Sequence, residues 1–274
     1  MKLAVCIVSH PTYIHSEAFR EVAQTLLWAL AELGHDVVMT DRALVPDRRT
    51  IVLGSNLLSR FPQPVPDDAI LYNLEQVESS RWFDESHLAL LRTHQVWDYS
   101  PRNARALELL GVPRVTVVPI GWAPCLRRIE LHLEPSIDVL FYGSMNERRN
   151  LVINELKARG VAVVPVFSIY GAGRDDLISK AAIVLNLHYF DLGVFELVRV
   201  SYLLANGCAV VSEGYLAADE IPFQAGVAFA PYSRLADVCC ALLKHPTELD
   251  KLAKAGQRII ESRPMTQYLA AVLP

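Results

Sequence analysis

Glu196 and Arg199 are the side chains whose types and spacing first suggest chemistry in this sequence. Three residues apart on a helix, they could form a surface ion pair worth only about 0.2–0.5 kcal/mol. At the start of a helix that follows a buried strand, however, Glu196 could accept hydrogen bonds from the two hydroxyls of a ribose. His188 and Tyr189 precede them, and a histidine at such a position is as often a structural hydrogen-bond donor as a catalyst.

A second group of chemically suggestive residues lies at Gly143–Arg149. Gly143 allows close backbone approach, Ser144 or Asn146 can cap the following helix, and such a turn can hold a phosphate. Arg148 and Arg149 fall in the first helical turn, where the helix dipole opposes each cation by roughly 0.3–1 kcal/mol. A bound phosphate would reverse that penalty, whereas solvation of both arginines is the simpler alternative.

Strands and helices at fixed places must position these side chains. Residues 183–187 form an apolar run of strand length, and residues 195–206 have a helical apolar pattern. Gly207 supplies a left-handed helix stop, and residues 209–212 read as the next strand. The site residues therefore sit in a strand, loop, helix, strand unit.

The rest of the chain alternates in the same way, in two series. The first contains strands at 3–9, 36–40, 50–53, 69–74, 95–99 and 114–118, with helices at 19–33, 83–93 and 101–110. Ser16 is expected to cap the first helix and Gly34 to stop it. The second contains strands at 137–142, 161–166, 183–187, 209–212 and 227–230, with helices at 147–159, 175–181, 195–206, 235–244, 247–261 and 265–273.

The two series predict two doubly wound α/β domains, residues 1–130 and 131–274, with a cleft between them. The proline- and glycine-containing segment 119–136 is typical of an interdomain linker. The last helix is a candidate to pack back on the N-terminal domain.

Composition excludes several classes of protein. A formal net charge of -4 argues against an extended nucleic-acid interface. No apolar run approaches the roughly 18 residues of a membrane span, and the N-terminal run is too short for a signal sequence. Five cysteines without CxxC spacing indicate reduced core residues in a cytoplasmic protein.

Three segments carry a resemblance to a known family: DVLFYGSMNERR (138–149), IYGAGRDDLISKAAIVLNLHY (169–189) and FELVRVSYLLANGCAVVSE (195–213). Weaker matches are YNLEQV (72–77) and DYSPRNARALELLGVPRVTVVPIGW (98–122). The chain resembles glycosyltransferases of the GT-B fold, specifically bacterial group 1 and spore-maturation-type enzymes. In these, two Rossmann-like domains face each other across a cleft.

The resemblance implies that the C-terminal domain binds a nucleoside-diphosphate sugar as donor. Gly143 and Ser144 would approach the diphosphate, Arg148 or Arg149 would neutralise it, and Glu196 would take the ribose hydroxyls. Tyr170 and Gly171 would lie near the base. The full implied donor set is Gly143, Ser144, Arg148, Arg149, Tyr170, Gly171, His188, Phe195, Glu196 and Arg199.

The sequence departs from the family's EX7E pattern at one position. His188 stands eight residues before Glu196, where that pattern has its first glutamate. The substitution puts the retaining mechanism of the EX7E families in doubt. No DxD motif is present, and GT-B enzymes generally bind no metal, so we expect neither a metal nor a cofactor.

The N-terminal domain should bind the acceptor. His10 and Glu75 follow strands at the edge where side chains would reach the cleft, and either could be the general base that deprotonates an acceptor hydroxyl. For each, an ordinary loop residue is the competing interpretation, and Asp98 with Tyr99 is a weaker candidate pair.

The sequence thus predicts a metal-independent glycosyltransferase that moves a hexose or related sugar to a hydroxyl of an unknown acceptor. A nucleotide-sugar isomerase or hydrolase, or a degenerate GT-B binding module, would share the scaffold. The donor base and sugar, the acceptor, the anomeric outcome and the oligomeric state are left open.

Overall fold

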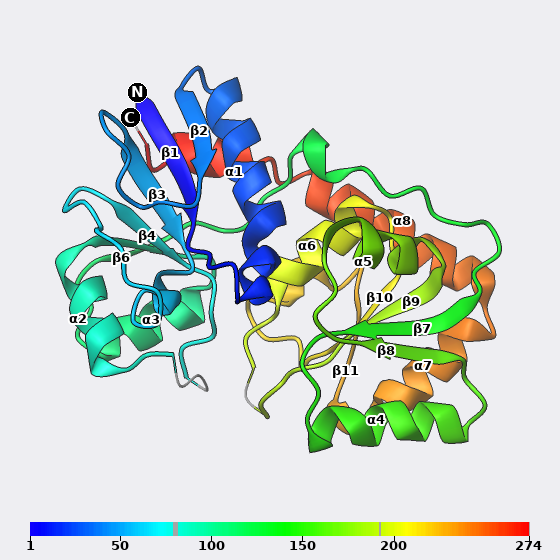
Figure 1. Cartoon of the computed structure of the whole chain (residues 1–274). Coiled ribbons are helices and arrows are strands. Elements are labelled where there is room, and N and C mark those ends of the chain that lie inside the picture. Colours follow the sequence, from blue (N-terminus) through cyan, green and yellow to red (C-terminus); the bar gives the residue numbers. More distant parts are fainter. Residues whose placement is uncertain (79–81, 192, 274) are drawn as a thin grey trace. The chain divides into compact units, whose positions relative to one another are not determined.

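The computed structural model describes residues 1–78, 82–191 and 193–273 of the chain. It divides into two compact units (Figure 1). The N-terminal unit comprises Met1–Cys125 and Pro264–Pro274, and the C-terminal unit comprises Leu126–Arg263. Segment 119–136, predicted to be a linker, contains the first of these two boundaries.

A parallel sheet forms the centre of the N-terminal unit. Its strand order is β2-β1-β3-β4-β5-β6. The strands are short and almost entirely apolar because both faces of the sheet are covered, as is usual in parallel sheets. They are β1 (Lys2–Ile7), β2 (Asp36–Thr40), β3 (Arg49–Leu53), β4 (Ile70–Asn73), β5 (Gln95–Asp98) and β6 (Val115–Val117).

Helices cover this sheet. The α-helices are α1 (Arg20–Glu32), α2 (Glu85–Thr93), α3 (Pro101–Leu109) and α9 (Met265–Ala270). The 3-10 helices are η1 (Ile14–Phe19), η2 (Ser55–Leu57) and η3 (Pro124–Leu126). On α1 the buried apolar side chains include Val22, Leu26 and Leu30, and Gly34 follows the helix with φ +81°, as expected for its stop.

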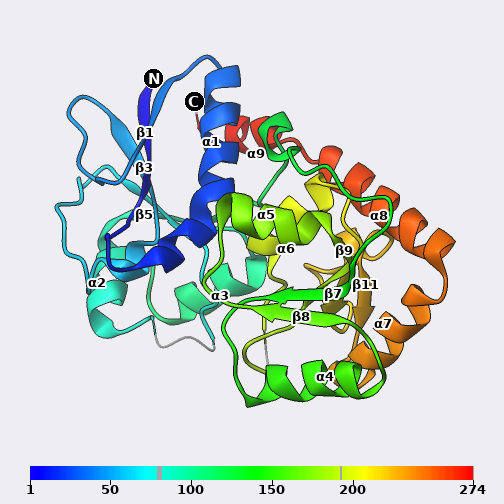
Figure 2. The same cartoon turned by 45° about the vertical axis from the view of Figure 1, so that its right-hand side comes forward.

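The final helix, α9, belongs to the N-terminal unit although it comes last in the sequence. It lies against α1 (Figure 2). Met265 and Leu269 are buried, and the backbone N–H of Met265 donates to the carbonyl of Trp122.

The C-terminal unit is built around a second parallel sheet, of strand order β11-β10-β9-β7-β8. Its strands are β7 (Ile137–Tyr142), β8 (Val163–Val166), β9 (Ala181–Asn186), β10 (Val210–Glu213) and β11 (Ala228–Ala230). Its α-helices are α4 (Glu147–Ala158), α5 (Gly171–Ser179), α6 (Leu197–Ala205), α7 (Leu235–Leu243) and α8 (Pro246–Glu261). Two 3-10 helices, η4 (Ile221–Phe223) and η5 (Tyr232–Arg234), complete it. The predicted fold class, two doubly wound α/β domains, is confirmed.

Two local predictions were wrong. Ser16 does not cap α1: it is buried within η1, and its hydroxyl donates to the carbonyl of Tyr13. Helix α5 begins at Gly171, four residues before the predicted start at Asp175, so Gly171 and Gly173 lie in the helix rather than in a loop. Serine and glycine often mark helix boundaries, but Ser16 lies within η1, and Gly171 and Gly173 lie within α5.

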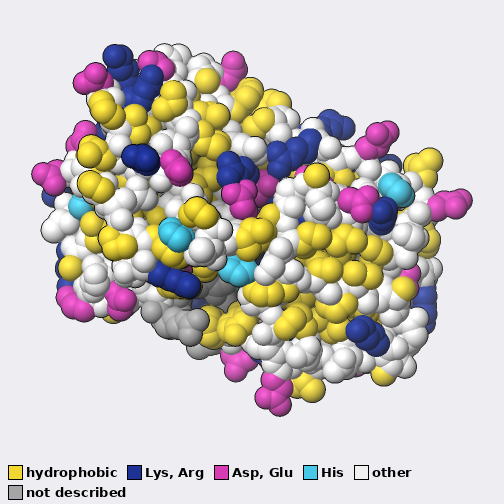
Figure 3. All heavy atoms as spheres, viewed as in Figure 1, with side chains coloured by type: hydrophobic (Ala, Val, Ile, Leu, Met, Phe, Trp, Pro, Cys, Tyr) yellow, Lys and Arg dark blue, Asp and Glu magenta, His cyan; other side chains and the backbone are white. Residues whose placement is uncertain are grey.

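Strand β8 lies at the edge of its sheet, and hydrophobic side chains gather on the surface where it runs (Figure 3). Phe167, directly after the strand, is 50% exposed. Pro165 has no N–H to donate and so prevents continuous pairing along this edge. Among the described residues, no helix is both long and apolar enough to span a membrane.

Candidate functional site

The C-terminal sheet changes winding direction between β7 and β9. From β7 the chain continues to β8 on one side, and the later strands β9, β10 and β11 follow on the other side. In doubly wound sheets, the loops at the carboxyl ends of such a strand pair diverge and leave room for a ligand. Gly143 follows β7, and His188 follows β9. The two sequence segments predicted to do chemistry therefore meet at one edge of this sheet.

Asn146 caps α4. Its side-chain oxygen accepts a hydrogen bond from the backbone N–H of Arg149 at 2.9 Å, and its Nδ2 donates to the carbonyl of Tyr189 at 2.8 Å. Of the two caps proposed from the sequence, Asn146 is the one used. Ser144 is exposed beside it.

Arg149 is buried beneath the turn that follows β7. Its Nη1 donates to the carbonyl of Ser144 at 2.7 Å, its Nη2 to that of Leu187 at 2.5 Å, and its Nε to that of His188 at 3.3 Å. The guanidinium thus binds the loops after both strands with neutral carbonyl groups. Burial lowers the pKa of Arg149 to about 10, so it stays charged at neutral pH.

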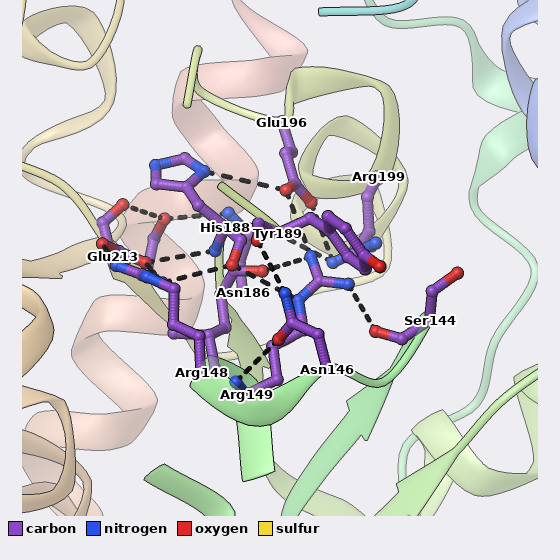
Figure 4. Close-up of polar contacts among 12 residues, drawn as sticks. Ser144, Asn146, Arg148, Arg149, Asn186, His188, Tyr189, Glu196, Arg199 and Glu213 are labelled. Carbon is purple, nitrogen blue, oxygen red and sulfur yellow. Dashed lines mark hydrogen bonds and ion pairs between the residues drawn. The ribbon is translucent and has the colours of Figure 1, made fainter. Parts of the chain in front are cut away.

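Glu196 lies at the N-terminus of α6 and is surrounded by three potential cations (Figure 4). Its Oε2 is 2.9 Å from Nη1 of Arg199, and its Oε1 is 3.6 Å from Nη2 of Arg149 and 3.7 Å from Nδ1 of His188. Burial alone would raise the pKa of Glu196, but Arg199, with His188 and Arg149, lowers it to about 2. The carboxylate is therefore ionised and can only accept hydrogen bonds.

Arg199 makes further contacts besides its ion pair with Glu196. Its Nη1 also donates to Oδ1 of the buried Asn186 at 3.1 Å, and its guanidinium lies over the ring of Tyr142. The i, i+3 spacing correctly predicted the contact with Glu196, but not its burial.

Gly143 lies directly against these two guanidiniums. A Cβ atom at this position would be 3.2 Å from Nη2 of Arg199 and 3.4 Å from Nη1 of Arg149. Its φ of +153° also favours glycine. The backbone of this turn therefore lies next to the guanidiniums of Arg149 and Arg199, at the N-terminus of α4.

Arg148 has a different environment from its neighbour. It forms a bidentate ion pair with the fully buried Glu213, with Nη1 2.6 Å from Oε2, and its Nε contacts Asp191 at 2.7 Å. Its guanidinium lies over the ring of Tyr232, 4.0 Å from the centroid. The expected dipole penalty at Arg148 is thus offset by protein carboxylates.

His188 is buried, and its Nδ1 has no hydrogen-bond partner among the residues described. The ring packs so closely on Gly193 that a Cβ atom there would be 2.4 Å from Nδ1. His188 therefore faces Glu196 across a gap too long for a direct hydrogen bond.

Phe195 lies in the core of its unit, before the start of α6. Its side chain is 1% exposed and packs on Phe223 and Phe229, with ring centroids 5.4 and 5.1 Å away. That Phe195 contributes to the donor set stays a prediction. Tyr170 directly precedes α5 and makes no capping hydrogen bond with its side chain, and Gly171, with φ +55°, is exposed beside it.

In the N-terminal unit, His10 follows β1 and stacks on Phe61 with ring centroids 4.4 Å apart. The backbone N–H of Thr12 donates to its Nδ1 at 3.3 Å. The hydroxyl of Thr12 also lies 2.8 Å from Nδ1 and can donate or accept there, depending on the tautomer of the ring.

Glu75 follows β4 in a loop that is fixed through its backbone. Its N–H donates to Oδ1 of Asn73 at 3.2 Å, and its carbonyl accepts from Asn73 and from Asn103, each at 2.9 Å. Asn73 in turn donates to the buried Asp98 at 2.6 Å. Asp98, the weaker sequence candidate, therefore supports the Glu75 loop.

Sequence reasoning missed Glu213 and Asn186 as parts of the site. Glu213 and Asn186 end β10 and β9 respectively, and a polar residue at the carboxyl end of an apolar strand was the signal available for both. Nothing in the sequence paired Glu213 with Arg148, 65 residues away.

No family model matches the chain. Two uncharacterised proteins of Acanthamoeba polyphaga mimivirus are similar in sequence. L140 is 28% identical over 195 residues, which is 65% of this chain and 61% of L140. L137 is 23% identical over 205 residues, which is 72% of this chain and 27% of L137. The chain thus matches less than two thirds of the length of either relative.

Solved structures show the fold. A sucrose-phosphate synthase from Thermosynechococcus elongatus superposes with a TM-score of 0.62 at 12% identity, over 99% of this chain and 98% of that one. Anabaena HepE in complex with UDP-glucose gives 0.58 at 12% identity over 100% and 99%. A T4 phage BGT variant in complex with UDP-glucose gives 0.57 at 13% identity over 99% and 98%. The chain has the GT-B fold of glycosyltransferases.

Proposed function

We propose that the protein is a glycosyltransferase that moves a sugar from a nucleoside diphosphate to an acceptor hydroxyl. The observation that carries the proposal is Gly143 at the N-terminus of α4, with the guanidiniums of Arg149 and Arg199 against it and the ionised Glu196 behind them. Helix N-termini and fixed guanidiniums stabilise the charge that develops on a departing diphosphate.

Within this proposal, Arg149 and Arg199 neutralise the diphosphate, while Gly143 and Ser144 approach it with their backbone. Among the residues described, the buried Arg149 contacts three backbone carbonyls, one carboxylate at 3.6 Å and the rings of Phe141 and Tyr189, so it gains most from an incoming anion. Arg148 is assigned a supporting role because Glu213 already neutralises it.

Glu196 is proposed to bind the ribose. Its lowered pKa keeps it ionised, so both oxygens accept hydrogen bonds from vicinal hydroxyls. Tyr170 and Gly171, at the carboxyl end of the neighbouring strand β8, are proposed to border the base.

On the acceptor side, we propose Glu75 as the general base and His10 as a hydrogen-bond donor to the acceptor. In the tautomer whose Nδ1 accepts from the backbone N–H of Thr12, the His10 proton lies on Nε2, which supports this division of roles.

We further propose that transfer needs no metal ion or cofactor. Among the residues described, no three His, Cys, Asp or Glu side chains are grouped to hold a metal ion. In this proposal Arg149 and Arg199 take the place of a cation at the diphosphate. UDP-glucose, present with HepE and with the T4 phage BGT variant, is the first donor to test.

The test is calorimetric binding of UDP, GDP and their sugars to the wild type and to Glu196→Ala. We expect Glu196→Ala to abolish binding, since it removes the acceptor of the ribose hydroxyls. Glu155→Ala, at an exposed position on α4, is the matched control and should bind like the wild type.

Failure of the wild type to bind any nucleotide, or unchanged binding in Glu196→Ala, would overturn the donor assignment. Product analysis with and without acceptors then separates transfer from hydrolysis or isomerisation. Binding without turnover would identify a non-catalytic module.

A further inference from the structure

Glu213 is a fully buried carboxylate at the end of β10, and its side chain contacts Arg148 on α4 and the backbone of His188 (Figure 4). Its two oxygens bind the Arg148 guanidinium, and Oε2 also accepts the backbone N–H of His188 at 3.2 Å. A buried charge of this kind is costly unless it is paired and hydrogen-bonded, and Glu213 is both.

The Glu213–Arg148 pair binds both sides of His188. Glu213 accepts its N–H, and Nη1 of Arg148 donates to its carbonyl at 3.2 Å. Arg148 also binds Asp191, three residues further along the same loop. The backbone of His188 is thereby fixed through two of its polar groups by one ion pair.

The side chain of His188 lies beside the carboxylate of Glu196. Its buried Nδ1 has no hydrogen-bond partner among the described residues and lies 3.7 Å from Oε1 of Glu196. At this distance the imidazole lies against the carboxylate, so the place of the His188 ring limits the orientations that Glu196 can adopt.

We propose that Glu213 is a positioning residue of the donor site. Through Arg148 and the His188 backbone, it holds the imidazole of His188 against the Glu196 carboxylate and so keeps that carboxylate oriented for the hydroxyls of the nucleotide sugar. This inference rests on the proposed donor function.

The first test is Glu213→Gln, which keeps the size of the side chain and removes its charge. We expect the affinity for UDP-glucose to fall at least tenfold. The ¹⁵N signal of the His188 ring should also shift in the ligand-free protein, because its backbone is released. Glu155→Gln, on the exposed face of α4, is the control and should change neither.

Because Glu213→Gln leaves Arg148 buried without its partner, it is also expected to reduce stability. The double variant Arg148→Met/Glu213→Leu removes both charges and fills the space with apolar atoms, which usually restores stability. If Glu213 positions His188, stability recovers while donor affinity stays low. If the pair merely stabilises the fold, both recover, and the proposal is overturned.

The ligand-free His188 signal separates this inference from the proposed function. A wild type that binds no nucleotide removes the donor site, yet an unshifted signal in Glu213→Gln independently refutes the positioning role. An unchanged UDP-glucose affinity in Glu213→Gln refutes it as well.

Discussion

Two adjacent arginines of α4 have opposite environments. Arg148 is neutralised by Glu213 and Asp191, whereas Arg149 is bound mainly by the carbonyls of Ser144 and Leu187. Carbonyls satisfy the hydrogen bonds of a guanidinium but leave most of its charge uncompensated. An anion near Gly143 would therefore be attracted mainly by Arg149, with Arg199 beside it.

Gly143→Ala tests whether close backbone approach matters at this turn. The added Cβ would be 3.2 Å from Nη2 of Arg199, and the φ of +153° is unfavourable for alanine. We expect nucleotide affinity to fall at least tenfold by calorimetry. Gly173→Ala, in α5, is the control. Its Cβ would make an ordinary 3.5 Å contact with Ile169, so this variant should bind normally. Equal affinity of both variants would contradict the role given to the turn.

Asp98 should make the stability of the protein depend on pH. Burial raises its pKa to about 7 against hydrogen bonds from Asn73, Ser100, Asn103 and Tyr99, which lower it. The folded state therefore holds a proton that the unfolded state releases near pH 4, so stability falls as pH rises from about 4 to 7.

The expected loss is about 2–3 kcal/mol between pH 5 and pH 7, at about 1.4 kcal/mol per unit of pKa shift. Urea unfolding of the wild type and of Asp98→Asn, which cannot titrate, measures it as the difference between their pH profiles. Parallel profiles over this range would show that Asp98 does not titrate as argued.

Contacts between site residues could be predicted from the sequence where both residues belong to the same helix or helix end. The Glu196 and Arg199 contact follows from helical spacing, and the Asn146 cap from its place before α4. The Arg148 and Glu213 pair joins two elements 65 residues apart, and no local pattern encodes it.

At the scale of elements, apolar runs predicted strands well because a parallel strand buried on both faces must be continuously apolar. The runs at 36–40 and 137–142 are β2 and β7. Helix starts were predicted less well. The pattern predicts that α5 begins at Asp175, but the helix begins at Gly171. Glycine is accepted there because the N–H groups of the first helical turn have no intrahelical partners.

Helix α6 links the candidate site to the packing of its unit. It begins at the Glu196 cap, and its buried face includes Leu204, which contacts α8 at Gly256. A Cβ at Gly256 would be 2.7 Å from the backbone carbonyl oxygen of Gly226 and 2.7 Å from Leu204, so a larger residue would force the backbone at Gly226 to shift. The position of the site helix thus depends on a small residue 60 positions from Glu196 in the sequence.

At the scale of the whole molecule, the first boundary between the units is fixed on the C-terminal side by Asn206. Its Oδ1 accepts the backbone N–H groups of Arg128 and Ile129, and its Nδ2 donates to the carbonyl of Leu126. The predicted linker of residues 119–136 is therefore only partly a free connection, because Leu126–Ile129 is bound to the end of α6.

The second boundary, at Pro264, gives a prediction about the chain's last segment. Removing residues 264–274 should destabilise the N-terminal unit, to which α9 belongs. Met265, Leu269 and Leu273 are buried, and each contributes about 1.5–3 kcal/mol by burial. Hydrogen exchange followed by mass spectrometry should show faster exchange in α1, against which α9 packs.

The same truncated chain tests whether the donor site is contained in the C-terminal unit. All the residues proposed to bind the donor lie within Leu126–Arg263, so UDP should still slow exchange in the segments around Gly143 and Glu196. Gln267→Ala, on the exposed face of α9, is the control and should leave both α1 exchange and UDP protection unchanged. Loss of UDP protection in the truncated chain, with the C-terminal unit still protected from exchange elsewhere, would mean that donor binding also requires the N-terminal unit.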